Sequence, residues 1–158
     1  MPEAIIQRTY GKSDVLNIEK ISLNDPTDDE ILIKQTAIGI HFHDVYVRTG
    51  LYKTLNLPGT PGVEASGIVE KLGKNVNDLN VGDRVVYITG SYGAYSSHRV
   101  INHKIVAKIP DELDDATMAT NFSRALTVNM LTEQVFSLKD KRTILVTAAA
   151  GGVGRLLC

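Results

Sequence analysis

The residues best suited to chemistry form a glycine-rich turn late in the chain. Gly151, Gly152, Val153 and Gly154 follow directly on residues 143–150 (TILVTAAA), which are apolar in succession. Continuous apolarity is typical of a strand buried on both faces of a parallel sheet. Glycines between such a strand and a helix allow a tight turn and let backbone N–H groups approach a pyrophosphate. The pattern predicts a dinucleotide-binding turn, with Ala148 at the first glycine position of the usual fingerprint.

Two histidines, His41 and His43, are the residues that could invite a metal ion. Zinc catalysis needs about three protein ligands on an open tetrahedral site. On an extended segment, residues two apart point to opposite faces, and the sequence offers no evident third ligand. The single cysteine, Cys158, leaves no cysteine cluster for zinc and no internal disulfide. We therefore predict no metal site, and a reducing compartment fits the chain.

The elements that must position these residues change character along the chain. The first two thirds consist of short runs rich in β-branched residues, separated by turn signals. The predicted strands span residues 3–9, 15–23, 30–39, 63–72, 84–89, 94–101 and 105–109. Gly67 inside one of these runs indicates a bulge or a close backbone approach. Many short strands at close spacing predict an antiparallel, barrel-like β domain.

A helical pattern replaces the strands beyond residue 111. Residues 116–136 carry Met118, Phe122, Leu126 and Met130 at intervals of four, which predicts a helix. A polar link then leads to the predicted buried strand at 143–150. We place a domain boundary at residue 121, so that residues 1–121 form the β domain and residues 122–158 open a second one.

Composition excludes several classes of partner. The 158 residues are 43% hydrophobic and 22% charged, with a net charge of −1. A nucleic-acid or anionic-membrane partner usually demands a basic patch, which we do not expect here. No stretch approaches the roughly 20 apolar residues that span a bilayer, and the N-terminus does not predict a signal peptide. The expected location is cytoplasmic.

Six stretches together resemble one enzyme superfamily, in its order. They are residues 37–52 (AIGIHFHDVYVRTGLY), 61–69 (PGVEASGIV), 81–87 (VGDRVVY), 93–97 (GAYSS), 126–128 (LTV) and 148–154 (AAAGGVG). The chain resembles the zinc-free, zeta-crystallin-like quinone oxidoreductase branch of the medium-chain dehydrogenase/reductase superfamily. The resemblance implies a mixed α/β fold, with a GroES-like antiparallel β-barrel domain followed by the first strand and glycine loop of a Rossmann domain. It also implies truncation at the C-terminus.

The branch is assigned from the positions of the zinc ligands. Zinc alcohol dehydrogenases of the superfamily carry a cysteine where His41 stands and a histidine where Val63 stands. The resemblance therefore implies chemistry without zinc. Quinone oxidoreductases typically have asparagine at the position of His41. A neutral imidazole can also donate and accept a hydrogen bond, but with a different reach and with a charge that varies near neutral pH.

The resemblance also implies an activity and a set of site residues. The activity is NADPH-dependent hydride transfer to a quinone. The full-length parent enzyme would be a homodimer. Tyr46 and Tyr52 would be the catalytic residues lining the cleft, with Tyr52 as a donor hydroxyl. The implied cofactor contacts are His41, Thr127, Gly151, Gly152, Val153 and Gly154. Asp44, Arg48 and Glu64 are interpreted as structural.

Three alternatives stay open beside quinone reduction. They are zinc-free reduction of an activated alkene (an enone), a non-catalytic role as a binding or structural protein, and a non-catalytic product of a truncated gene. Because the predicted strand at 143–150 has no parallel neighbours in the sequence, we expect the 158-residue chain to be inactive alone. We also expect NADPH not to stabilise it.

Overall fold

The computed structural model describes residues 1–138 and 143–158. The chain divides into two compact units, Met1–Thr120 and Asn121–Cys158, so the division falls within one helix, α2 (Asp115–Asn129). The predicted boundary lay at residue 121. The assignment of the two units as a substrate domain and the start of a nucleotide-binding domain stays a prediction.

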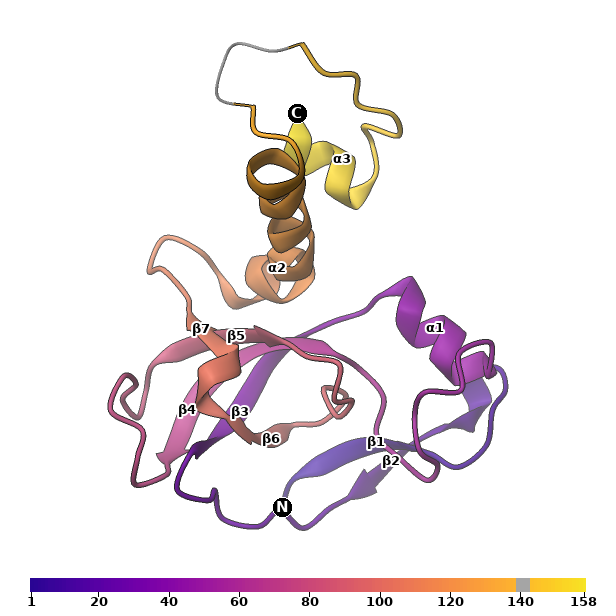
Figure 1. The fold of residues 1–158 in the computed structure, drawn as a ribbon. Helices are drawn as coiled ribbons and strands as arrows, with labels where there is room; N and C mark the ends of the chain where they lie inside the picture. The colour runs from indigo at the N-terminus through magenta and orange to yellow at the C-terminus, as the bar shows by residue number, and fades with distance from the viewer. Residues whose placement is uncertain (139–142) are drawn as a thin grey trace. The chain divides into compact units, whose positions relative to one another are not determined.

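The first unit is built on a five-stranded antiparallel sheet with the order β6-β3-β4-β5-β7 (Figure 1). The strands of this sheet are β3 (Glu30–Gly39), β4 (Glu64–Leu72), β5 (Arg84–Ile88), β6 (His98–Asn102) and β7 (Val106–Lys108). The single turns η1 (Ser13–Val15) and η2 (His103–Ile105) and the helix α1 (Phe42–Thr49) complete its elements, together with β1 (Glu3–Gln7) and β2 (Leu16–Lys20). The predicted antiparallel β architecture is confirmed.

A bulge between β3 and β4 lies where Gly67 predicted one. Gln35 pairs with Gly67 and Ala37 with Ser66, so Thr36 is the extra residue on β3. A Cβ on Gly67 would collide with the carbonyl oxygen of Lys34 and lie 2.6 Å from Cγ2 of Ile33. Only glycine therefore allows the two backbones to approach this closely.

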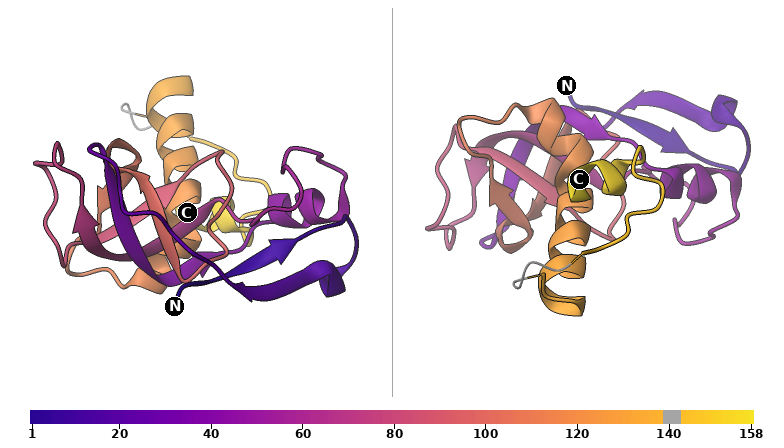
Figure 2. Two further views of the ribbon diagram at one scale, coloured as in Figure 1. Left: turned by 90° about the horizontal axis from the view of Figure 1, so that it is seen from below. Right: turned by 90° about the horizontal axis from the view of Figure 1, so that it is seen from above.

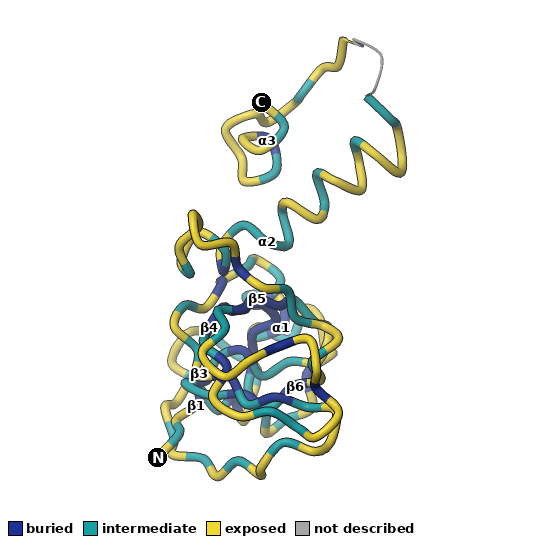
Figure 3. Tube along the Cα trace, turned by 90° about the vertical axis from the view of Figure 1, so that its left-hand side faces the viewer, coloured by how far each residue is buried: buried dark blue, intermediate teal, exposed yellow. Residues whose placement is uncertain are grey.

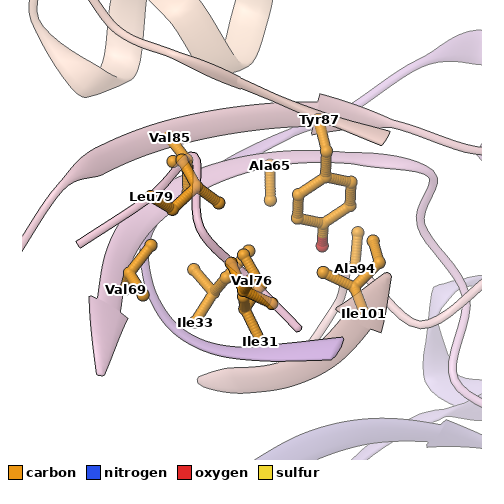
Figure 4. Packing of buried hydrophobic residues seen from close by; sticks show 10 residues of the cluster. All are labelled: Ile31, Ile33, Ala65, Val69, Val76, Leu79, Val85, Tyr87, Ala94 and Ile101. Carbon is orange, nitrogen blue, oxygen red and sulfur yellow. The ribbon is translucent and has the colours of Figure 1, made fainter. Parts of the chain in front are cut away.

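The core lies on the concave side of this sheet (Figure 4). Alternation along β3 buries Ile31 and Ile33 completely, while Lys34 is exposed. The buried cluster comprises Ile31, Ile33, Ala65, Val69, Val76, Leu79, Val85, Tyr87, Ala94 and Ile101. The Tyr87 hydroxyl donates to Oε1 of Gln35, and the Arg99 guanidinium lies 5.0 Å from the ring centroid. Figure 3 shows the buried residues concentrated on β3, β4, β5 and β6.

A separate two-stranded sheet, β1 with β2, extends beside α1 (Figure 2). The backbone N–H of Gly11, in the turn between these strands, donates to the carbonyl of Arg48 at 3.0 Å. Alternation in β2 predicted a strand with one buried face, and that prediction is wrong. Ile18 is 72% exposed because β2 pairs only with β1. Nothing in the described part of the chain covers its apolar side chain.

The second unit is helical where it is regular. Helix α2 continues into a π-helical turn, η3 (Met130–Val135), which confirms the helix predicted over 116–136. Leu126 and Met130 on its apolar stripe are about half exposed. A six-residue helix, α3 (Gly152–Leu157), follows the glycine turn.

The strand predicted at 143–150 is wrong. Residues 143–146 have no regular structure and residues 147–150 form a turn. Leu145 is 90% exposed. A parallel strand needs a neighbour to satisfy its backbone groups, and the described residues of this unit contain no strand.

None of the helices among the described residues combines the length and the apolarity that crossing a membrane requires.

Candidate functional site

Helix α1 positions most of the side chains that sequence analysis singled out in the first unit. The helix begins after His41, whose backbone N–H donates to the Asp44 carboxylate at 2.8 Å. It ends at Gly50, which has a left-handed φ of 82° and donates its N–H to the carbonyl of Val47 at 3.1 Å. Val47 is fully buried and anchors the helix. The extended segment assumed for His41 and His43 is therefore wrong, because Asp44 caps a helix at this point.

Tyr46 and Tyr52, the predicted catalytic residues, lie together on an exposed aromatic face. Their ring centroids are 5.3 Å apart at 68°, an edge-to-face contact. The backbone N–H of Tyr52 donates to the Tyr46 carbonyl at 3.0 Å, which fixes the loop after the helix. Phe42 extends the face, with its ring 6.4 Å from that of Tyr46. Tyr46 is 38% exposed and Tyr52 45%, so both rings present surface to a ligand.

Three further polar side chains join this face, and their association was not predicted from the sequence. The His43 ring stacks on Tyr92 at 6.0 Å and 7°, and it lies 5.7 Å from the Tyr52 ring. Nε2 of His43 is 3.0 Å from the Tyr92 hydroxyl, which is 2.5 Å from Oγ1 of Thr54. Tyr92 lies 49 positions from His43 along the chain, so only the folded sheet brings them together. No local sequence signal indicated this contact.

His41 contacts a buried carboxylate rather than facing open space. Nε2 of His41 forms a close ion pair or hydrogen bond with Oε2 of Glu64, which is fully buried on β4. An imidazole N–H can donate to a carboxylate in either its neutral or its charged form, so the pair is satisfied in both states. The atom that meets Glu64 is itself buried. A cofactor contact by His41 therefore has to use other atoms of the residue, and this role stays a prediction.

Asp44 is a buried structural carboxylate, as interpreted from the sequence. Besides capping α1, it accepts a hydrogen bond from the Tyr95 hydroxyl at 3.0 Å. Burial, and then the negative charge of Asp44, raise the pKa of Tyr95 well above its usual value. Tyr95 therefore stays a neutral donor at physiological pH, and it holds the base of the helix.

The predicted cofactor residues of the second unit lie on α2 and on the glycine turn. The Thr127 hydroxyl donates to the carbonyl of Ser123 at 2.9 Å, within the helix. Gly151 caps α3, and Gly154 is buried where a Cβ would lie 2.5 Å from the Ala148 carbonyl oxygen. Gly151, Gly152 and Val153 remain accessible on the outside of the turn. The turn is thus as tight as the sequence predicted, although its preceding strand is absent.

Arg124 lies beside this turn and was not singled out from the sequence. A Cβ on Gly152 would be 2.6 Å from Nε of Arg124, so the guanidinium packs directly over the glycine backbone. Arg124 is one helical turn from Thr127 on α2. A planar cation next to accessible glycine backbone is suited to hold a phosphate.

The described residues contain no group of three histidine, cysteine, aspartate or glutamate side chains arranged to hold a metal ion. His41 and Glu64 are paired with each other. The prediction that the chemistry proceeds without zinc stays a prediction.

Comparison with known proteins gives a consistent result. Residues 27–111 match the Alcohol dehydrogenase GroES-like domain family, over more than half of the chain. A quinone oxidoreductase of Salmonella typhimurium is 39% identical over 149 residues, covering 94% of this chain and 46% of the relative. A 2-haloacrylate reductase of a Burkholderia species is 32% identical over 162 residues, covering 99% of this chain and 49% of the relative.

The same fold occurs in a crystal structure of Escherichia coli quinone oxidoreductase complexed with NADPH. Its TM-score is 0.89 at 38% identity, covering 99% of this chain and 48% of that one. The chain therefore spans about half the length of the proteins it matches. Matched over its GroES-like domain and along nearly its whole length, it belongs to the quinone oxidoreductase branch of the medium-chain dehydrogenase/reductase superfamily.

Proposed function

We propose that a protein carrying this chain transfers hydride from NADPH to a quinone. The observation that carries the proposal is the aromatic face formed by Phe42, Tyr46 and Tyr52 on and after α1. Exposed aromatic rings held in fixed orientations favour a planar, electron-poor ring through stacking and edge contacts. Relatives named as quinone oxidoreductases support the same substrate class.

The residues of the second unit fit a nicotinamide dinucleotide. Gly151 and Gly152 would let the pyrophosphate reach the backbone, and Arg124 would supply a cation beside it. Thr127, one turn along α2, would add a polar contact. The relative solved in complex with NADPH supports that form of the cofactor. When bound, the dinucleotide would supply the hydride.

The residues of the first unit would position the substrate. Tyr46 and Tyr52 would hold the quinone ring and exclude water from one face. The Tyr52 hydroxyl, on a half-exposed side chain, would donate a hydrogen bond to a quinone oxygen as negative charge develops there. Glu64 and Asp44 are buried and would keep α1 in place without contacting the substrate.

Reduction of an activated alkene is a second candidate function. The relative named 2-haloacrylate reductase favours it, because the carbon–carbon double bond of such a substrate is conjugated with a carboxylate. An aromatic face would bind a flat enone as well as a quinone. The two reactions differ in where the proton goes, to oxygen in a quinone and to carbon in an alkene.

A substrate panel tests the proposal and separates the two candidates. NADPH oxidation by the protein that carries this chain is measured with a benzoquinone, a naphthoquinone, an enone and 2-chloroacrylate. We expect kcat/KM for the quinones to exceed that for the alkenes by at least about tenfold, and Tyr52→Phe to lower it by about 10–100-fold. Lys53→Ala, at the exposed neighbouring residue, serves as the control. Equal or greater activity with the alkenes would establish the second function.

The purified 158-residue chain is the comparison for a non-catalytic product. The α3 helix has six residues, and isolated helices shorter than about 12 residues are marginal. We expect saturating NADPH not to raise the melting temperature of this chain. A clear thermal shift would contradict that expectation and place a complete cofactor site within these residues.

A further inference from the structure

Beyond the tyrosines assigned to the substrate, the first unit contains a continuous hydrogen-bonded chain of groups that exchange protons. Thr54 Oγ1 lies 2.5 Å from the Tyr92 hydroxyl, and that hydroxyl lies 3.0 Å from Nε2 of His43. Thr54 is exposed, Tyr92 is partly buried, and the His43 ring lies against Tyr52. The chain therefore runs from solvent to the aromatic face.

The ring orientations hold this chain in place. His43 and Tyr92 are stacked within 7° of parallel, and α1 fixes His43 because Val47 anchors the helix in the core. Thr54 and Tyr52 belong to the same short loop, which the Tyr52 N–H ties to the Tyr46 carbonyl. His43 and Tyr92 are therefore held both by their mutual stacking and by the elements that carry them.

His43 has a nitrogen at each end of this arrangement. Nε2 faces Tyr92, whereas Nδ1 has no hydrogen-bond partner within residues 1–138 and 143–158 and is not buried. An imidazole can take up a proton at one nitrogen and release one from the other. The titratable groups recorded against the ring are Tyr92, from the loop after β5, and Tyr52, from the loop after α1. In the described part of the chain no carboxylate or cation pairs with it.

We infer that His43 is the proton donor to the reduced substrate and that Tyr92 and Thr54 reload it from solvent. The inference rests on the proposed function. A quinone that accepts a hydride gains one proton and two electrons, and the nicotinamide C–H bond breaks. The product anion takes a second proton from Nδ1 of His43, forming an O–H bond. His43 recovers a proton at Nε2 from the Tyr92 hydroxyl, which takes one from Thr54 or from the water in contact with it.

Chemical rescue distinguishes this role from a structural one. His43→Ala removes the shuttle, and we expect kcat for quinone reduction to fall by about 100-fold. Imidazole in the buffer should restore at least about a tenth of the lost rate, because a free imidazole can enter the space left by the side chain. Tyr92→Phe keeps the stacked ring but interrupts the series of hydrogen bonds between Thr54 and His43. We therefore expect a smaller fall in kcat than in His43→Ala, an unchanged KM and a larger solvent deuterium isotope effect. His103→Ala, on η2, is the matched histidine control. Its kcat should equal that of the wild type and should not rise when imidazole is added.

Loss of rate in His43→Ala without rescue, or an unchanged rate in both variants, would overturn the inference. If the wild-type protein reduces no quinone, the proposed function fails separately. In that case nitrogen-15 NMR of the His43 ring still decides the relay. Tyr92→Phe should then change the tautomer ratio of His43 and slow proton exchange at its Nε2. A His43 spectrum identical in wild type and Tyr92→Phe would show that no relay exists.

Discussion

At the scale of single residues, the base of α1 depends on one buried carboxylate shared by two donors. Asp44 accepts from the His41 backbone N–H at 2.8 Å and from the Tyr95 hydroxyl at 3.0 Å. Removing either donor leaves the carboxylate with one partner. Removing the carboxylate would leave the partly buried Tyr95 hydroxyl without its acceptor, which costs about 1 kcal/mol.

Tyr95→Phe tests this contact through pH. The pKa of Tyr95 is raised, chiefly by burial and then by Asp44. Above the unfolded-state value of about 10, the unfolded chain loses this proton while the folded chain keeps it. The stability from this group is therefore complete below pH 10 and declines above it, by about 1.4 kcal/mol per pH unit. Burial raises the pKa of Tyr87 as well, so part of the decline should survive in the variant.

Urea unfolding of the two proteins at pH 8 and pH 11 measures the difference. We expect Tyr95→Phe to be less stable by about 1 kcal/mol at pH 8. Its loss of stability between the two pH values should be smaller than that of the wild type. An equal loss in both proteins would show that Tyr95 ionises normally in the folded state.

At the scale of elements, the sequence correctly predicted the features that depend on residue patterns within a single segment. Alternation through Ile31, Ile33 and Gln35 predicted β3 with its observed bounds, and Gly67 predicted the bulge opposite it. Helix α1 was missed because its aromatic residues point outward rather than into the core, as Phe42 at 79% exposure shows. The His43–Tyr92 contact was missed because pairing across 49 residues depends on tertiary structure.

Gly67→Ala tests the bulge at this scale. The added methyl would meet the Lys34 carbonyl, which is backbone and has little freedom to move. We expect a loss of about 1–3 kcal/mol in the free energy of unfolding, measured by chemical denaturation. Gly90→Ala is the matched control, because nothing lies within 4 Å of a Cβ there and its φ is not positive. It should change stability by less than about 0.5 kcal/mol.

At the scale of the whole molecule, the two units differ in how much they bury. The core residues all lie in Met1–Thr120. Among the described residues of Asn121–Cys158, only Gly154 is buried. The glycine turn was predictable because its geometry is local. The strand that the sequence predicted before this turn is absent, because a buried parallel strand forms only with partners on both sides.

Leu145→Glu tests the consequence for association. Leu145 is 90% exposed in an apolar segment, so we expect it to promote contacts between copies of the purified chain. The glutamate should lower the fraction of oligomer seen by sedimentation velocity, with the thermal unfolding midpoint unchanged. Glu133→Gln, elsewhere in the same unit, provides the control for a general effect of charge. A lower midpoint in Leu145→Glu would show that Leu145 is packed in solution.

The pairing of β2 with β1 alone has a consequence for the order in which the molecule opens. β4 has hydrogen-bonded neighbours on both sides, β3 and β5, whereas β2 has one. Local opening therefore requires the loss of fewer contacts at β2 than at β4. In native-state hydrogen exchange, amides of Leu16–Lys20 should exchange through local fluctuations whose rate is independent of denaturant. Those of Glu64–Leu72 should exchange only through global unfolding of the first unit, so β2 can open and close while the five-stranded sheet stays intact.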